Sequence, residues 1–497
     1  MASRVLNPAR IEQHEGAALL VAVVGLPLAL VVFLLFAFDR GPDFLTFGVL
    51  AIFFLGLASM FLLTGGPLVT GWYSAPGFMT ILASVEFVAI PFVRFITGAD
   101  RLDSYFLRAL MYLLLGFSVF WLACWLLRKP ASLSFRPEFA SENPRILFFA
   151  LLLFCSGAAA QFLLWKLGII GYEASTLRYT ADVSAMGLLS AVSRGLDMAM
   201  LVSGIEFFGK HSKSFAIRII FVLSFTLTLA FGLISGMKLG VLMPLFTLAV
   251  LLGITQKRLP RIVWAFPLVY LALQPFVTAY RTNLNAGYDM QIGTIGGLTN
   301  TMSKSIQDAL SGRSSLSSSH RSSFETAGAR LSVLTLFHNV LQLPSPDLLN
   351  GDETVWMAPF YPFIPRPLWR NKPVFNKGQR MSEALGIGKV SSTNVPGVAD
   401  MYALGGLPGI ISGMFIWGAC LQLFMNTVRG GMTEKGTFFY VLILFSLTNI
   451  ERDTVAMIGG AVEMACILLV ISRIIYGGTF FSFRSAIAYT VPRKVQA

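Results

Sequence analysis

The feature that most constrains the fold is a series of apolar blocks, each roughly 20 residues long, the length at which a helix crosses the hydrocarbon layer of a bilayer. Of the 497 residues, 55% are hydrophobic and 13% are charged, whereas a soluble domain carries about 25% charged residues. We therefore expect an all-α polytopic membrane protein. This composition excludes an ordinary soluble enzyme, a disordered chain and a coiled coil.

Apolar blocks of sufficient length predict about 12 transmembrane helices. Their approximate bounds are 17–37, 44–64, 78–97, 105–127, 146–167, 187–208, 215–234, 237–254, 261–279, 402–426, 436–449 and 454–476.

Lysine and arginine alternate between the connections of these predicted helices. With the N-terminus inside, the inner segments carry 18 Lys and Arg, and the five short outer loops carry one each. Cationic loops stay on the cytoplasmic side, so we expect both termini on the cytoplasmic side of the membrane. This rule also accounts for the net charge of +13 without nucleic acid as a partner.

One connection is much longer than the others. It covers about 120 residues and divides the chain into nine transmembrane helices, a large outer loop, and three further helices with a cytoplasmic tail, at 1–279, 280–401 and 402–497. The loop holds 11 basic and 8 acidic residues. Because loops of this length are usually functional, we expect the site here.

Parts of this loop have local structure of their own. Residues 303–320 are Ser-rich and predict an amphipathic piece followed by a turn. Residues 324–343 predict a helix that ends before Pro344. Five prolines in 358–373 exclude a regular helix and predict an ordered extended segment at the membrane surface. The expected apolar face of the helix consists of Leu331, Leu334, Phe337 and Leu341.

The proline-rich stretch FIPRPLWRNKPVFNKGQR contains five cations, which all lie within a span of 15 residues. A rigid cluster of this kind suits a diphosphate at headgroup depth, since arginine binds phosphate oxygens in pairs. The alternative is a patch that only touches anionic lipid. The cations are Arg366, Arg370, Lys372, Lys377 and Arg380.

The stretch SSTNVPGVADMYALGGLPGIISG leads from the loop into the tenth predicted helix. Asp400 is expected at its outer mouth, either as a charge stabilised by a helix N-terminus or as a general base. Three glycines spaced by four, at 405, 409 and 413, predict a close helix-packing face, and glycines 232, 236 and 240 repeat the pattern.

Other ionisable residues are weaker candidates. Arg194 and Asp197 are three residues apart in the sixth predicted helix, so they can pair with each other or line a polar cavity. Glu86 in the third predicted helix is a further candidate for a polar cavity. His338 is a candidate acid or base on the loop helix. The four cysteines lie inside apolar blocks and form neither a disulfide framework nor a zinc motif, so we expect no metal and no cofactor.

The two motif stretches resemble a pattern of bacterial Wzy-type polymerases, which polymerise O-antigen or exopolysaccharide repeat units. The match covers roughly 50 of the 497 residues, and three residues depart from it: Arg370 replaces a frequent Pro, and Ala403-Leu404 replace a frequent Asn-Phe. Arg281 and Arg330 lie where the family places arginines. The matching residues are Arg366, Trp369, Lys372, Pro373, Gly378, Gln379, Pro396, Gly397, Asp400 and Tyr402.

The resemblance implies a GT-C-like helical bundle and a metal-independent glycosyltransferase in the bacterial inner membrane. It would transfer a growing glycan from undecaprenyl diphosphate to an incoming lipid-linked repeat unit, within membrane lipids and alongside a chain-length regulator and a flippase. The expected bases are Asp400 first, then Glu353, Glu325 or His338. The expected diphosphate and substrate ligands are Arg281, Arg330, Arg366, Arg370, Lys372, Lys377, Arg380 and Tyr402.

Three alternatives stay open. An O-antigen ligase shares the expected fold and cationic loop and differs in its acceptor. A lipid-linked oligosaccharide flippase or other transporter usually shows internal repeats, and we find none. A scaffold of an export complex gives no reason for a proline-braced cationic segment.

Overall fold

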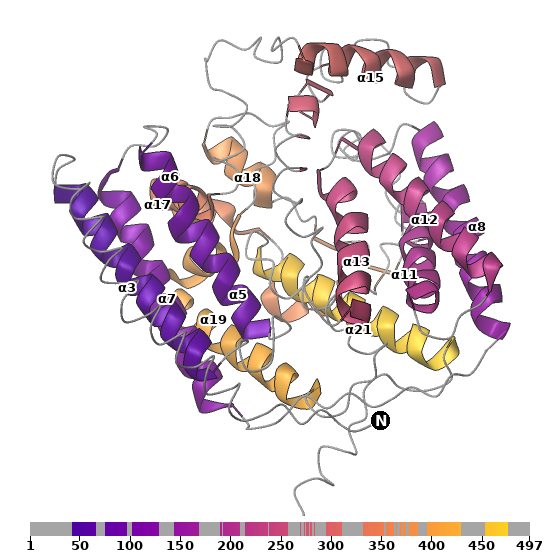
Figure 1. Cartoon of the computed structure of the whole chain (residues 1–497). Coiled ribbons are helices and arrows are strands. Elements are labelled where there is room, and N and C mark those ends of the chain that lie inside the picture. Colours follow the sequence, from indigo (N-terminus) through magenta and orange to yellow (C-terminus); the bar gives the residue numbers. More distant parts are fainter. Residues whose placement is uncertain are drawn as a thin grey trace, which may run out of the picture.

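A computed structural model gives the arrangement of the helices (Figure 1). The structure describes residues 42–65, 75–96, 102–128, 144–167, 189–190, 192–208, 214–236, 238–256, 269, 273, 275–277, 279–280, 283, 295–310, 332–351, 354–361, 364, 368–369, 371–373, 377–385, 395–428 and 453–475.

Every regular element in the described part of the chain is helical, as the sequence predicts. The described helices pack in two groups. The first contains helices from the beginning and the end of the sequence, and the second contains helices from the middle of the sequence. The first group consists of α3 (Pro42–Gly65), α5 (Ala75–Ser84), the π-helical segment η2 (Val85–Ala89), α6 (Ile90–Ile96), α7 (Ser104–Leu126), α17 (Val333–Leu341), α18 (Lys377–Ala384), α19 (Gly397–Val428) and α21 (Thr454–Ile474). The second consists of α8 (Pro144–Lys166), α11 (Gly195–Phe208), α12 (Phe215–Ile234) and α13 (Lys238–Gln256).

Six helical stretches within the described residues are long and apolar enough to cross a membrane. The predicted segments 17–37 and 436–449 lie outside the described residues, so the count of 12 stays a prediction. The sixth predicted helix, 187–208, is interrupted by a turn at Arg194, and α11 begins only at Gly195. The six stretches are Asp43–Leu62, Ala75–Phe95, Ser104–Leu126, Arg145–Lys166, Phe215–Ile234 and Gly397–Asn426.

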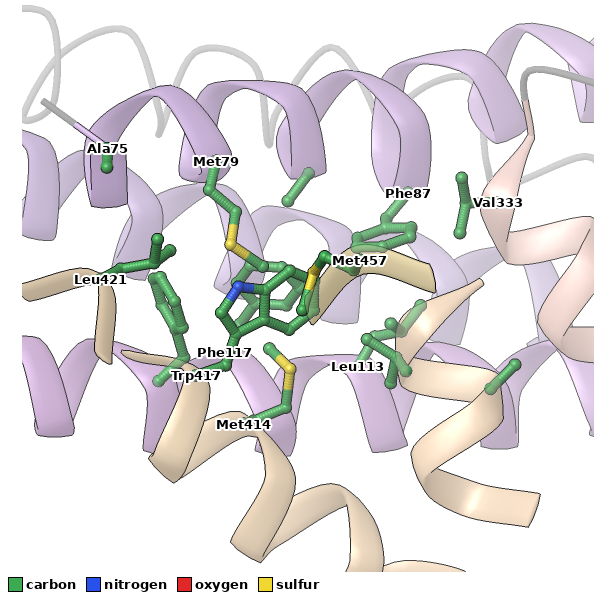
Figure 2. Close-up of a cluster of buried hydrophobic side chains, with 14 of the residues drawn as sticks. Ala75, Met79, Phe87, Leu113, Phe117, Val333, Met414, Trp417, Leu421 and Met457 are labelled. Atoms are coloured by element: carbon green, nitrogen blue, oxygen red, sulfur yellow. The ribbon is translucent and has the colours of Figure 1, made fainter. Parts of the chain in front are cut away.

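Aromatic and methionine side chains fill the core of the first group (Figure 2). Phe117 of α7 packs edge-on against Phe87 of η2, with ring centroids 5.6 Å apart, and Met414 of α19 is fully buried beside them. The buried Trp121 indole N–H is satisfied, because it donates to Thr80 Oγ1 at 3.0 Å. This core holds α19 against α7 although their residues are almost 300 positions apart.

Glycines set the closest helix contacts. A Cβ on Gly418 of α19 would lie 2.6 Å from the Phe120 carbonyl oxygen of α7, and one on Gly232 of α12 would lie 2.3 Å from the Gly240 carbonyl oxygen of α13. The predicted packing role is therefore confirmed for Gly232 and Gly240. Gly236, in the turn between these two helices, has a φ of +63°, which favours glycine.

The glycines at 405–413 have a more specific role than a face between separate helices. Gly406 has a φ of +62°, and this breaks α19 into two halves. A Cβ on Gly409 would lie 2.3 Å from the Met401 carbonyl oxygen, and one on Gly413 would lie 2.6 Å from the Met401 sulfur. Both glycines thus pack against the first half of their own helix, whereas Gly405 borders open space.

The long connection contributes short helices that lie on the ends of α7, α19 and α21. Ser332 caps α17 by accepting the Thr335 N–H, and Leu334, Phe337 and Leu341 are buried as predicted. Two 3-10 turns follow, η5 (Pro346–Leu349) and η6 (Val355–Met357), and then α18. The described part of 358–373 contains no regular helix, but it forms hydrogen-bonded turns where an extended segment was expected.

Candidate functional site

A buried ion pair joins the two segments that carry the sequence motifs. Lys377, the first residue of α18, places its Nζ 2.6 Å from Oδ1 of Asp400 in the first turn of α19. The Lys377 side chain is 4% exposed and the Asp400 side chain is 0% exposed. A carboxylate and an ammonium this deeply buried stabilise each other only as a pair.

The second oxygen of Asp400 binds the start of another helix. The Thr454 N–H donates to Asp400 Oδ2 at 2.9 Å, and Thr454 is the first residue of α21. The first N–H groups of a helix have no partner within it, and the helix dipole favours a negative charge there. Asp453 satisfies a further such group by accepting the Ala456 N–H at 2.8 Å. Asp400 therefore stabilises a helix N-terminus, as one of the two predicted roles requires, and the helix is α21.

These contacts define Asp400 as the joint between α18, α19 and α21. Both of its oxygens are engaged, and its charge is balanced by Lys377. In this arrangement Asp400 is shielded from solvent. The charge of Lys377 is in turn paired with that of Asp400.

A second polar cluster lies between α17 and the N-terminus of α7. His338 Nε2 is 3.0 Å from Asp103 Oδ2, and His338 Nδ1 is 3.2 Å from Asn339 Oδ1. The Gln342 side-chain nitrogen lies 3.1 Å from His338 Nε2. The imidazole stacks on Phe106, with 3.9 Å between the ring centroids and 14° between the planes.

Asp103 performs two tasks with one carboxylate. Its Oδ1 accepts the Phe106 N–H at 2.9 Å and caps α7, while its Oδ2 faces His338. Partial burial acts to raise the pKa of the Asp103 carboxyl, but the hydrogen bonds from His338 and the Phe106 N–H, with the charge of His338, lower that pKa below its usual value. The Asp103 side chain is 41% exposed and that of His338 10%. Of the two acid–base pairs, this one borders solvent.

Lys372 holds the proline-rich turns together. Its Nζ donates to the carbonyl oxygens of Tyr361 at 2.6 Å and Ile364 at 2.9 Å. The Tyr361 ring stacks on Trp369 with centroids 5.4 Å apart, and its hydroxyl accepts the Thr354 N–H at 3.0 Å. These contacts give Lys372 a bracing role inside the predicted cationic cluster.

Tyr402 belongs to an aromatic contact among three elements. Its ring lies 5.9 Å from Phe337 of α17 and 5.7 Å from Tyr112 of α7. Arg380, another predicted ligand, lies on α18 and is half-buried. Six other predicted site residues lie outside the described residues: Arg281, Glu325, Arg330, Glu353, Arg366 and Arg370.

Arg194 has a different ion-pair partner from the one that its spacing to Asp197 suggests. Arg194 forms a salt bridge with Glu463 of α21, not with Asp197 three residues away. The contact links the two helices at Arg194, where α11 begins. Among the described residues, no group of three or more His, Cys, Asp or Glu side chains is arranged to hold a metal ion.

Sequence reasoning missed Asp103 and Thr454. The available signal for Asp103 was a local one, since an Asp followed by Ser directly before an apolar block is a typical helix cap. No local pattern indicates its partner, because His338 is 235 positions away.

Together, the fold and these contacts define an α-helical membrane-embedded protein whose long connection folds onto the ends of its helices. The chain belongs to the family described as domain of unknown function DUF8712, whose model matches residues 155–435. That match includes His338, Lys377 and Asp400, whereas Asp103 and Thr454 lie outside it. Neither the curated proteins nor the solved structures give a match to this chain.

Proposed function

We propose that this protein is a glycosyltransferase that polymerises repeat units carried on undecaprenyl diphosphate. In this proposal, 12 transmembrane helices form a GT-C-like bundle in the bacterial inner membrane, with both termini in the cytoplasm and the loop 280–401 in the periplasm. The partners are the lipid-linked glycans, surrounding lipids, and a chain-length regulator and flippase of the same pathway.

The observation that carries the proposal is the contact between the two stretches that resemble Wzy-type polymerases. The Lys377 and Asp400 side chains, one from each stretch, meet at 2.6 Å in a fully buried position. If the two motifs belong to one site, their residues are expected to lie together in the fold although they are separated in the sequence. The contact supports a common role for the stretches, and the resemblance supplies the chemistry.

The contacts divide the tasks among the cations. Lys372 donates to backbone carbonyls and Lys377 to Asp400, so these two lysines position the segment. In the proposal, binding of the diphosphate belongs to Arg366, Arg370 and Arg380. Cations fixed in advance at the leaving group stabilise the negative charge that develops on it.

Of the described candidates for the general base, His338 suits the task better than Asp400. The Asp103 carboxylate lies 3.0 Å from His338 Nε2, the side-chain amide of Asn339 lies 3.2 Å from Nδ1, and these contacts hold the ring in place at the border of solvent. In the proposal, the His338 imidazole accepts the proton of the attacking sugar hydroxyl.

In the proposed step, the hydroxyl oxygen of the incoming repeat unit forms a bond to the anomeric carbon of the growing glycan. The bond from that carbon to the diphosphate oxygen breaks, and the electron pair leaves with the lipid diphosphate. The hydroxyl proton passes to His338. Asp103 stabilises the imidazolium that results, and it acts as a positioning residue.

The test uses purified protein in liposomes with a short undecaprenyl-diphosphate-linked repeat unit, EDTA and no nucleotide sugar. We expect a ladder of products from the wild type and from a Lys389→Ala control, a loop cation outside both motif stretches, and none from Arg366→Ala. Movement of the lipid-linked glycan across the bilayer without a ladder would overturn the proposal in favour of a flippase. Transfer only to lipid A core would overturn it in favour of a ligase.

A further inference from the structure

Helix α15 (Ile295–Leu310) has two faces of different character. The face turned toward the protein carries small residues, Gly297, Thr301 and Ser305, all buried. The neighbouring face carries a stripe of large apolar side chains at helical spacing. Three of these are strongly exposed, Ile295 at 72%, Ile306 at 48% and Leu310 at 84%. The polar contacts of α15 with the protein thus leave this apolar stripe uncovered.

The position of α15 is fixed by contacts to the end of a membrane-spanning helix. The Tyr280 hydroxyl donates to the carbonyl oxygen of Ile234, the last residue of α12, at 2.9 Å. Three residues further on, Asn283 Nδ2 donates to Ser305 Oγ and to Asp308 Oδ2, each at 3.1 Å. Since α12 is a spanning candidate, these bonds hold α15 near one surface of the bilayer.

The stripe also points toward that surface. Met302, in the middle of the stripe, packs against Tyr280, whose hydroxyl is bound to the end of α12. Tyr280 is 1% exposed, so it fixes where α15 docks on the protein and leaves contact with lipid to the exposed side chains of the stripe. Figure 1 shows α15 running across the direction of α12 and α13, which is the orientation expected of a helix that lies in the membrane plane.

We propose that α15 is an interfacial helix that lies in the membrane surface and buries Ile295, Ile306 and Leu310 among the lipids. A helix with one apolar stripe and one polar face, and with low overall hydrophobicity, binds in the plane of the interface. The segment carries one lysine and one aspartate, so the attraction is apolar and does not require anionic lipid. This inference does not depend on the proposed enzymatic activity.

The experiment places a nitroxide spin label at single cysteines in the full chain, with the four native cysteines replaced by alanine, in nanodiscs of zwitterionic lipid. The stripe is probed with Ile306→Cys and Leu310→Cys. The matched controls are Asn300→Cys and Gln307→Cys, which are exposed on the polar side of the same helix. We expect the stripe labels to collide severalfold more with oxygen than with a water-soluble nickel chelate, and the control labels to show the reverse.

Two results would overturn the proposal. Equal access of the nickel chelate to all four labels would place the stripe in water. Protection of the stripe from both probes would show that protein, such as a second copy of this chain, covers it. A photoreactive benzophenone at Ile306 or Gln307 tests the same point with the native cysteines retained: we expect lipid adducts from Ile306 alone, and a protein dimer would contradict the proposal.

Discussion

Lys377 Nζ and Asp400 Oδ1 lie 2.6 Å apart in a position closed to solvent, and this pair attaches the long connection to the start of α19, a candidate membrane-spanning helix. The remaining Asp400 oxygen accepts the Thr454 N–H. One carboxylate therefore links α18, the start of α19 and the start of α21. Its geometry is that of a joint, whatever chemistry takes place beside it.

Breaking this pair from one side should destabilise the protein more than replacing both partners. We expect Asp400→Asn and Lys377→Met each to cost about 3–5 kcal/mol, because each leaves a buried charge without its partner. The double variant removes both charges and should recover a large part of that loss. Unfolding measured in detergent for the four members of this double-mutant cycle checks the prediction. Additive losses in the double variant would contradict it.

The overall class followed from the sequence because hydrophobic periodicity and length are local properties. The apolar blocks near 44–64, 105–127 and 215–234 correspond to α3, α7 and α12 within a few residues. The apolar face of α17 was equally readable, since Leu334 and Phe337 are one helical turn apart and both are fully buried. Each of these predictions depends on neighbouring positions only.

The contacts that build the candidate site could not be predicted in the same way. Asp400 was expected at a helix mouth, but its partners are 23 positions upstream and 54 positions downstream. Lys372 and Lys377 were expected to bind an anionic ligand, yet the structure gives both a partner from the protein. A basic residue in a proline-rich segment has the same sequence pattern in either role, and only the fold decides between them.

The pair of Asp103 and His338 predicts an acid-sensitive contact. Because the pKa of Asp103 lies below its usual value in the folded protein, the unfolded chain binds more protons as the pH falls below about 4. The stability that Asp103 contributes is therefore present above that pH and is lost as the pH falls through the folded pKa. Asp103→Asn should lack this component, so its stability difference from the wild type should shrink between about pH 5 and pH 3.

Unfolding of both proteins across that pH range measures the difference. Asn retains the ability to cap α7, so capping does not enter the comparison. The matched control is Asp347→Asn, an exposed carboxylate on η5. A difference between wild type and Asp103→Asn that stays constant with pH would contradict the prediction.

The brace formed by Lys372 predicts a structural effect from a residue of the cationic segment. Lys372→Met removes the two bonds to the Tyr361 and Ile364 carbonyl oxygens, and we expect a loss of about 1–3 kcal/mol. Limited proteolysis between residues 354 and 377 should become faster. Asn371→Ala, an exposed neighbour, serves as the control. Unchanged stability and proteolysis with lost phosphate binding would instead assign Lys372 to the ligand.

The glycine contact between α7 and α19 predicts a position where an added methyl group is poorly tolerated. A Cβ on Gly418 would lie 2.6 Å from the Phe120 carbonyl oxygen, so Gly418→Ala must push the two helices apart, at a cost of about 1–3 kcal/mol. Gly56 in α3 has nothing within 4 Å of its Cβ position, so Gly56→Ala should be neutral or stabilising by up to about 1 kcal/mol. Thermal unfolding of both variants in the same detergent compares one substitution in two environments. Equal effects at the two glycines would show that α7 and α19 do not approach as closely as the Gly418 contact requires.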